Sequence, residues 1–261
     1  MPTFADQTGN SVYLPHFPVK IISVVPSQTE LLYELGLEQE VIAITKFCIH
    51  PASWFAGKQK AGGTKNLNLP LIHRLSPDLI IANKEENKKE QIEELIQHYP
   101  VWISDVNNLQ ESFDMIVQLG VITGKKEKAE NLVVAIQSGF NSLPVYKYRL
   151  RAVYLIWQNP YMTTGNGTFV NSMLWEAGFD NVFKDQFRYP VVTIDQIKEK
   201  RPDLILLSSE PYPFREEHAS EIQQLIPDTK VILVDGEAFS WYGSRLLLSP
   251  GYFQQLRERL E

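Results

Sequence analysis

The stretch LSPDLIIANKEEN, residues 75–87, decides how the rest of the sequence is interpreted. It joins the end of a helical pattern to a Pro-Asp turn, a short apolar run and a polar loop that carries glutamates. A short apolar run of this kind, bounded by turn residues, is typical of a strand buried on both faces of a parallel sheet. The same order of features returns at residues 200–212, KRPDLILLSSEPY. This repetition predicts two similar α/β halves.

Other short β-branched runs alternate with helical patterns along the chain. The expected strands are residues 19–25, 41–45, 78–82, 101–104, 150–157, 203–208 and 230–235. Alternation of strands and helices is the pattern of βαβ units, in which the strands are parallel. We therefore expect an α/β fold with two lobes, each built on a central, mainly parallel sheet flanked by helices.

The middle of the chain contains no expected strand. Residues 108–143 hold two amphipathic helical segments, and the second of these would be about nineteen residues and roughly 28 Å long. We expect it to be a single long backbone helix that joins the lobes. The expected domains are an N-terminal α/β lobe at 1–107, a helical connector at 108–145 and a C-terminal α/β lobe at 146–261.

The composition is that of a folded globular protein and excludes several kinds of partner. The chain has 261 residues, 44% of them hydrophobic, and a net charge of −6 without a long basic run, so we expect no nucleic-acid partner. Cys48 is the only cysteine, which excludes an internal disulfide and any multi-cysteine metal site. Neither a membrane-spanning run nor an export signal is recognisable in this chain.

Aromatic residues are concentrated in the segments that follow the expected strands. Ligands of open parallel sheets bind at the carboxyl ends of the strands, so these rings are expected to line a cleft for a flat, apolar ligand. Ser27, directly after the first long strand, belongs to the same set. The alternative is that the rings only pack loops together within one lobe. The aromatic candidates are Phe47, Trp54, Trp157, Tyr161, Tyr212, Phe214, Phe239, Trp241 and Tyr242.

The run DQTGNSVYLPHFPVKIISVVPSQTELLYELGL, residues 6–37, resembles the opening of the class III solute-binding proteins of ABC importers, in their cobalamin-receptor-like branch. The similarity continues through AGGTKNLNLPLIHRLSPDLIIA, residues 61–82, and covers nearly the whole chain. The resemblance implies two lobes joined by a rigid helix. It also implies capture of cobalamin, a ferric siderophore or haem for an ABC importer.

The resemblance also suggests roles for individual residues. His50 stands where similar cobalamin receptors place an aromatic ring, and it could ligate a metal that a macrocycle already holds. Thr64 and Phe239 match ligand-facing positions, although a tryptophan is expected at the position of Thr64. Each lobe of the family presents a glutamate to the transporter. The candidates for this docking role are Glu86, Glu90, Glu210 and Glu237.

Arg245 has two competing interpretations. Its guanidinium could pair with a carboxylate or amide of the ligand, or stack on an aromatic ring. Alternatively, it forms an ion pair with Asp235 or Glu237. The turn that contains Thr168 could either bind an anion or only start a helix. We favour the helix start, with Thr168 as its N-cap.

Nothing in the sequence indicates catalysis. Glu85, Glu86 and Glu210 lie at strand ends, but no nucleophile motif or phosphate loop accompanies them. We expect a non-catalytic protein without an intrinsic cofactor that captures a cobalamin-like corrinoid, or another metal chelate, in a cleft between two lobes for an ABC importer permease. It would be periplasmic or at the cell surface. The alternatives are a ferric-siderophore or haem receptor, or a cytoplasmic enzyme or chaperone that handles a metallocofactor.

Overall fold

The computed structural model describes residues 2–260, which divide into two compact units. Unit 1 consists of Met1–Val106, Gln110–Ile136 and Tyr242–Arg245. Unit 2 consists of Asn107–Leu109, Gln137–Trp241 and Leu246–Glu261. The chain thus passes from one unit to the other more than once, and each unit includes a short segment from a distant part of the sequence.

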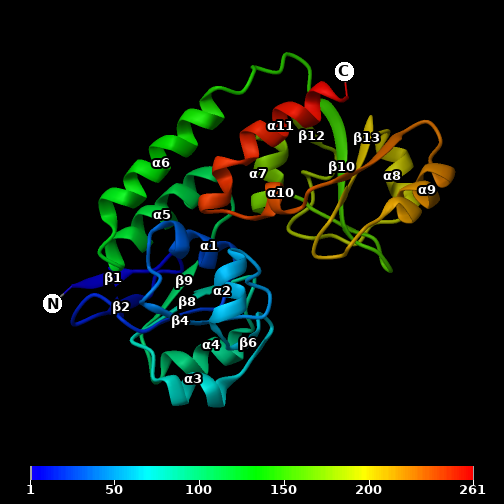
Figure 1. Cartoon of the computed structure of the whole chain (residues 1–261). Helices are drawn as coiled ribbons and strands as arrows, with labels where there is room; N and C mark the ends of the chain where they lie inside the picture. The colour runs from blue at the N-terminus through cyan, green and yellow to red at the C-terminus, as the bar shows by residue number, and fades with distance from the viewer. Residues whose placement is uncertain (1, 261) are drawn as a thin grey trace. The chain divides into compact units, whose positions relative to one another are not determined.

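Unit 1 is built on a five-stranded sheet in the order β5-β4-β3-β8-β9, with every neighbouring pair parallel (Figure 1). β4 lies on one side of β3 and β8 on the other, so the connections that leave β3 and β8 diverge. Its elements are β1 Thr3–Ala5, β2 Ser11–Tyr13, β3 Ile21–Ser23, α1 Pro26–Glu34, β4 Val41–Ile44, α2 Ala52–Gly57, β5 Gln59–Lys60, β6 Gly62–Gly63, β7 Asn66–Leu67, α3 Leu69–Leu75, β8 Leu79–Asn83, α4 Lys89–Ile96, β9 Val101–Ser104 and α5 Leu109–Ile122.

Helices cover both faces of this sheet. On one face, Ile22 and Ile80 pack in a core with Ile72 of α3 and Leu95 of α4. On the other face lies α1, whose buried Gln28 donates to Ser104 at the end of β9 and contacts the sulfur of Met115 in α5. Because both faces are covered, all five residues of β8 are buried, as a central parallel strand requires.

Unit 2 has a second five-stranded sheet in the order β11-β10-β13-β14, with β12 also paired to β10. The pairs β10–β13, β13–β14 and β10–β12 are parallel, whereas β11 is antiparallel to β10. Its elements are β10 Leu150–Trp157, β11 Met162–Thr163, α7 Phe169–Glu176, β12 Phe179–Asn181, α8 Ile194–Lys200, β13 Leu204–Ser208, α9 Glu216–Leu225, β14 Lys230–Val234, α10 Glu237–Ser240 and α11 Ser249–Glu258, and the 3-10 helix η1 spans Ser244–Leu247.

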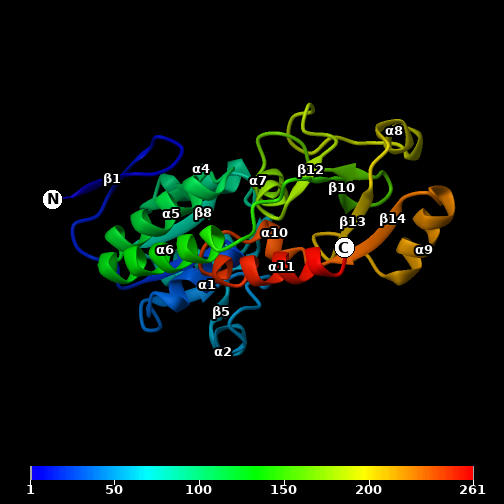
Figure 2. The ribbon, with the colours of Figure 1, turned by 90° about the horizontal axis from the view of Figure 1, so that it is seen from above.

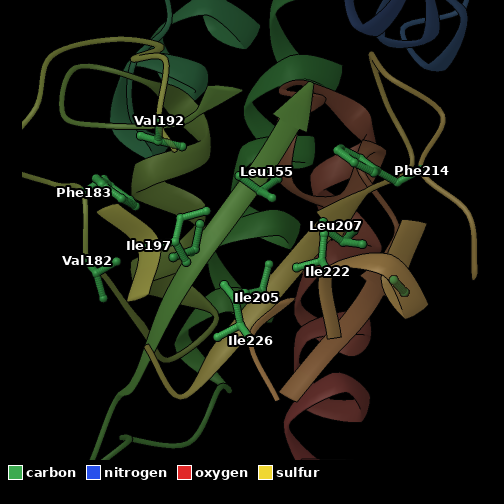
Figure 3. Close-up of a cluster of buried hydrophobic side chains, with 12 residues drawn as sticks. Leu155, Val182, Phe183, Val192, Ile197, Ile205, Leu207, Phe214, Ile222 and Ile226 are labelled. Atoms are coloured by element: carbon green, nitrogen blue, oxygen red, sulfur yellow. The ribbon is translucent and has the colours of Figure 1, made fainter. Parts of the chain in front are cut away.

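Alternate residues of the unit 2 strands face different helices. Leu155 and Leu207 point toward Ile197 of α8 and Ile222 of α9, and Figure 3 shows these side chains in one cluster. Figure 2 shows α9 beside β14. Tyr154 lies between Val153 and Leu155 of that cluster in the strand, so its side chain faces the opposite side of the sheet, where it meets the ring of Phe239 in α10. The unit 2 sheet is therefore also covered on both faces.

The repeated Pro-Asp turns have the same role in both units. Asp78 accepts hydrogen bonds from the backbone N–H groups of Val19 and Lys20, each at 2.9 Å, just before β3. Asp203 accepts from the backbone N–H of Arg151 in β10 at 2.7 Å. Each aspartate thus ties the start of its own strand to the neighbouring strand. The similarity seen between residues 75–87 and 200–212 corresponds to equivalent positions in two parallel sheets.

The expected strands and helices are confirmed. The stretches at residues 75–87 and 200–212 contain β8 and β13, and the strand-free middle contains α5 and α6 (Lys126–Asn141). α6 has 16 residues and is therefore about 24 Å long. The division between the units falls within this helix, after Ile136.

We expect substitution of Gly165 by alanine to destabilise unit 2 by about 1–3 kcal/mol. A Cβ at this position would collide with the backbone carbonyl of Gln186, which cannot move as a flexible side chain would. Gly251→Ala is the matched control, because a Cβ there meets no atom within 4 Å and lies in α11. Urea denaturation should show a loss for the first variant and a gain of about 0.5–1 kcal/mol for the second. Equal midpoints for the two variants would contradict the close approach at Gly165.

Candidate functional site

The carboxyl end of β10 presents an exposed tryptophan. Trp157 is the last residue of the strand, and 41% of it is exposed. Its ring meets Tyr212 edge to face, with ring centroids 5.6 Å apart. Tyr212 in turn packs at 4.8 Å against Phe214, which is 5% exposed. Unit 2 therefore offers one exposed ring supported by a half-buried ring and a buried ring.

The residues next to Trp157 are polar. Gln158 is 9% exposed and accepts a hydrogen bond from the hydroxyl of Tyr212 at 3.0 Å. Tyr161 follows in the same turn and is half-buried. Burial raises the pKa of the Tyr161 hydroxyl, and its hydrogen bond with Gln158 acts in the opposite direction. This surface can stack against a flat ligand and donate or accept hydrogen bonds at its rim.

In unit 1, the segment after β4 presents apolar side chains with lysines beside them. Phe47 and Phe55 are 50% and 40% exposed. The Nζ atoms of Lys46 and Lys60 lie 5.1 and 4.9 Å from the centres of these two rings. His50, between the two phenylalanines in sequence, is half-buried. The segment therefore combines exposed rings with positive charge, an arrangement suited to an apolar ligand that carries acidic groups.

Buried hydrogen bonds hold this segment in place from below. The thiol of Cys48 is fully buried and lies 3.1 Å from the hydroxyl oxygens of both Thr29 and Thr45. Burial raises the pKa of the Cys48 thiol, and the two threonine hydrogen bonds oppose this effect only in part. Cys48 is therefore a neutral structural residue that anchors the loop to α1.

The carboxyl ends of β3 and β8 form the topological switch point of the unit 1 sheet, which is where ligands of open α/β sheets bind. Tyr242 fills this position and is 8% exposed. Burial raises the pKa of its hydroxyl well above the ordinary value, the carboxylate of Glu86 adds to this, and contacts with Ser104 and Ser27 oppose it. Tyr242 thus occupies the place that a ligand group takes in other sheets of this kind.

Arg245 follows Tyr242 into unit 1 and pairs with α1. Its Nε donates to Oε2 of Glu30 at 2.9 Å, and its Nη2 donates to Oε1 of the same carboxylate at 2.7 Å. The backbone N–H of Gly243 donates to the hydroxyl of Ser112 in α5 at 3.3 Å. The expected ion pair with Asp235 or Glu237 is therefore replaced by one with Glu30. A bidentate pair of this geometry attaches residues 242–245 to unit 1.

We expect Arg245→Ala to lower the free energy of unfolding by about 1–3 kcal/mol, because both side chains are mostly buried, with 14% and 20% exposed. A double-mutant cycle with Glu30→Ala should give a coupling of about 1–2 kcal/mol. The control is the pair of Lys89 and Glu93, whose side chains are 82% and 58% exposed. A coupling for Arg245 no larger than that of this exposed pair would show that the contact does not hold the segment.

Several predicted ligand residues lie in the interior. Phe239 is completely buried between the rings of Tyr154, Tyr252 and Phe253, and Trp54 is 1% exposed. Both rings therefore pack in the core of their units and have no free face in this structure. The other predicted residues that are less than a tenth exposed are Ser27, Thr64, Phe214, Trp241 and Tyr242.

The buried position of Trp241 has a specific cause. Its indole Nε1–H donates to Oε1 of Glu210 at 2.9 Å, and the hydroxyl of Ser240 donates to the same oxygen. Glu210 is therefore engaged inside unit 2.

Of the other glutamates expected to contact a transporter, Glu90 is exposed in the first turn of α4 and Glu237 is half-buried in α10. The side chain of Glu86 is accessible, yet desolvation raises the pKa of its carboxyl, and Lys65 acts in the opposite direction.

The structure also adds residues that the sequence reasoning missed. Phe187 is 72% exposed in the loop after β12, and Ile49 is 45% exposed beside Phe47. His218 lies within hydrogen-bonding distance of Tyr212. Only Phe187 carries a signal that could have been used, because it is an aromatic residue in a polar loop that follows a strand. Thr168 is confirmed as an N-cap, accepting from the backbone N–H of Asn171.

Within residues 2–260, no group of three or more histidine, cysteine, aspartate or glutamate side chains could hold a bare metal ion. No helix in the same range is long and apolar enough to span a bilayer.

Comparison with known proteins places this geometry in context. Residues 21–229 match the family described as "Periplasmic binding protein". The chain is 27% identical over 217 residues to an uncharacterized ABC transporter substrate-binding lipoprotein of Bacillus subtilis (YvrC), covering 78% of this chain and 68% of the relative. It is 26% identical over 239 residues to a vitamin B12-binding protein of Pectobacterium carotovorum, covering 89% and 86%. A periplasmic haem-binding protein of Vibrio cholerae superposes with a TM-score of 0.78 at 20% identity, covering 92% and 98%, which shows a shared fold.

Proposed function

The chain belongs to the periplasmic binding protein family, and from this premise we propose that it captures a cobalamin-like corrinoid and delivers it to an ABC importer. The family consists of binding proteins, so no catalytic step is part of the proposal. The two units would act as the two lobes of a class III protein, with α6 as the backbone helix.

The observation that carries the proposal is the exposed ring of Trp157, which is supported by Tyr212 at the carboxyl end of β10. A tryptophan backed by a second ring is already oriented for stacking, which lowers the cost of ordering it when a ligand binds. Unit 1 has a comparable surface at the carboxyl end of β4, where Phe47 is half exposed. Relatives that cover most of this chain are named vitamin B12-binding proteins, which favours a corrinoid among the flat ligands.

The ligand-contact residues that we propose are those that retain accessible surface. They are Phe47, His50, Trp157, Tyr161 and Tyr212. Ser27 and Thr64, at strand ends, would contribute only the small part of their surface that is exposed. Tyr242 and Arg245 are proposed as supports for the unit 1 surface, because their polar groups already have partners in that unit.

Metal coordination by the protein would involve His50. Its imidazole is half-buried, in a loop anchored by Cys48, and a single imidazole is sufficient as an axial ligand when a macrocycle supplies the other donors. If His50 has this role, the ligand could also be haem, and the lysines beside Phe47 and Phe55 would favour its carboxylates. A haem or ferric-siderophore receptor is therefore the second candidate function.

The partner in transport would be an ABC importer permease, which relatives of this type serve as substrate-binding proteins. Glu90 and Glu86 are the proposed contact residues in unit 1, since both residues are exposed, although the carboxyl of Glu86 is the more desolvated group. Glu237 is the proposed contact in unit 2, because Glu210 is held by Trp241. This role would put the protein in the periplasm or at the cell surface. A cytoplasmic carrier of a metallocofactor on the same fold remains the competing proposal.

The test is a titration of the purified chain with hydroxocobalamin, haemin and a ferric catecholate siderophore in separate experiments. Absorbance changes in the ligand bands and calorimetric heats report binding, and the proposal expects one-to-one saturation by hydroxocobalamin at micromolar concentration. His50→Ala should remove any shift caused by axial ligation without abolishing stacking. Saturation by haemin alone would establish the second candidate, and no heat with any of the three would overturn both.

A further inference from the structure

A hydrogen-bonded chain in unit 2 begins at His218, the third residue of α9. The backbone N–H of Arg215 donates to Nδ1 of His218 at 2.9 Å. Because a backbone N–H can only donate, Nδ1 must carry its lone pair, and the proton of the neutral ring must be on Nε2. The imidazole is therefore held in one tautomer by the start of the helix, where it satisfies an N–H group that the helix itself leaves without a partner.

The chain continues to the side chains that face Trp157. Nε2 of His218 lies 3.1 Å from the hydroxyl oxygen of Tyr212, so this hydroxyl accepts from the imidazole. The same hydroxyl donates to Oε1 of Gln158 at 3.0 Å, and Nε2 of Gln158 lies 3.4 Å from a carboxylate oxygen of Glu221. Each group in this series donates to the next, and the first bond of the series needs the lone pair on Nδ1 of His218.

Packing adds to these hydrogen bonds. The ring of His218 meets Tyr212 and Phe214 with centroid distances of 5.4 and 5.6 Å. Tyr212 is thus fixed on one side by two rings and at its hydroxyl by two hydrogen bonds, and its other side supports Trp157. The orientation of Trp157 depends on Tyr212, which in turn depends on His218.

We propose that His218 is a positioning residue that holds the Trp157–Tyr212 surface in place when it is neutral and releases it when it is protonated. The proposal rests on the proposed function, in which Trp157 stacks on the ligand. A protonated imidazole carries hydrogens on both nitrogens, and its Nδ1–H would face the N–H of Arg215 without an acceptor. Histidine is the side chain that ordinarily changes charge between pH 5 and 8, and this range is therefore the one to test.

Charged groups of both signs lie near His218 along the chain. Glu216, Glu217 and Glu221 lie on the same helix, and Arg215 immediately precedes it. From the facing segment comes the hydroxyl of Tyr212, 3.1 Å from Nε2 of His218, which meets the imidazole as a hydrogen-bonding group. The geometric conflict at Nδ1 is therefore the feature that links protonation to movement of the imidazole.

The experiment uses the ligand-free full chain and the emission of Trp157, obtained at each pH as the difference between the wild type and Trp157→Phe. We expect this emission to change in one step as the pH falls from 8 to 5. Tyr212→Phe keeps the ring and the helix start but removes the hydroxyl, and it should abolish the step. His218→Gln should also abolish it, because glutamine at this position accepts the N–H of Arg215 without titrating. A step that persists in both variants would overturn the proposal.

Two further measurements complete the test. Long-range ¹⁵N NMR at pH 8 should show the proton of His218 on Nε2, and a proton on Nδ1 would contradict the assignment. Hydroxocobalamin should bind the wild type about 3- to 10-fold more weakly at pH 5.5 than at pH 8, as expected for one lost hydrogen bond, and His218→Gln should show less than about a twofold change. If hydroxocobalamin does not bind at either pH, the corrinoid assignment fails, whereas the emission of Trp157 still decides the role of His218.

Discussion

Replacing Phe239 by alanine is expected to lower the free energy of unfolding by about 3–5 kcal/mol, the largest loss predicted for a single side chain of this protein. The ring is completely buried, with Phe253 and Tyr154 at centroid distances of 4.8 and 5.2 Å. Its removal deletes contacts on several sides and leaves a cavity that β10 and α11 cannot fill by small movements. Urea denaturation followed by circular dichroism measures the change.

Phe187→Ala is the matched control for this substitution, because the same side chain is removed from a position that is 72% exposed. Its effect should be about 1 kcal/mol or less. Ligand affinity of Phe239→Ala, measured below its melting transition, should stay close to that of the wild type. A variant that keeps full stability but loses binding would place Phe239 in the ligand-facing set after all.

Trp157→Ala is expected to weaken the binding of hydroxocobalamin by about tenfold or more, which corresponds to the roughly 1–3 kcal/mol of a lost aromatic contact. Stability should change little, because much of the ring is exposed before the ligand arrives. Tryptophan emission should be quenched when hydroxocobalamin binds to the wild type, and this quenching should be reduced in the variant. Calorimetry gives the affinity of both proteins.

Trp175→Ala serves as the control for binding. Trp175 belongs to the same unit and is 54% exposed, but it stacks on Arg149 at 3.6 Å near the end of α7 and does not follow the carboxyl end of a strand. Its removal should leave the affinity unchanged. Equal losses in the two variants would indicate a general effect of surface tryptophans and would remove the main support for a ligand surface at β10.

The role of Arg245 shows how a correct chemical expectation can have the wrong partner. The sequence indicated either a ligand contact or an ion pair with a nearby acid, and the structure has an ion pair with Glu30, 215 positions away. Nearby acids are the natural candidates when only sequence distance is available. The choice of Glu30 depends on residues 242–245 entering unit 1, and no local pattern reports that path.

The sequence by itself determined the α/β class, the positions of seven strands (β3, β4, β8, β9, β10, β13 and β14) and the equivalence of the two Pro-Asp turns. These features depend on neighbours within a few residues, because apolar runs, turn residues and helical periodicity act locally. Only the tertiary structure decided which aromatic residues remain accessible. Phe239, Trp241 and Tyr242 lie within four positions, yet one is enclosed by other rings, one bonds to Glu210 and one fills the switch point of unit 1. Burial is set by contacts between distant segments, and therefore a cluster of rings in sequence is separated into different environments in the fold.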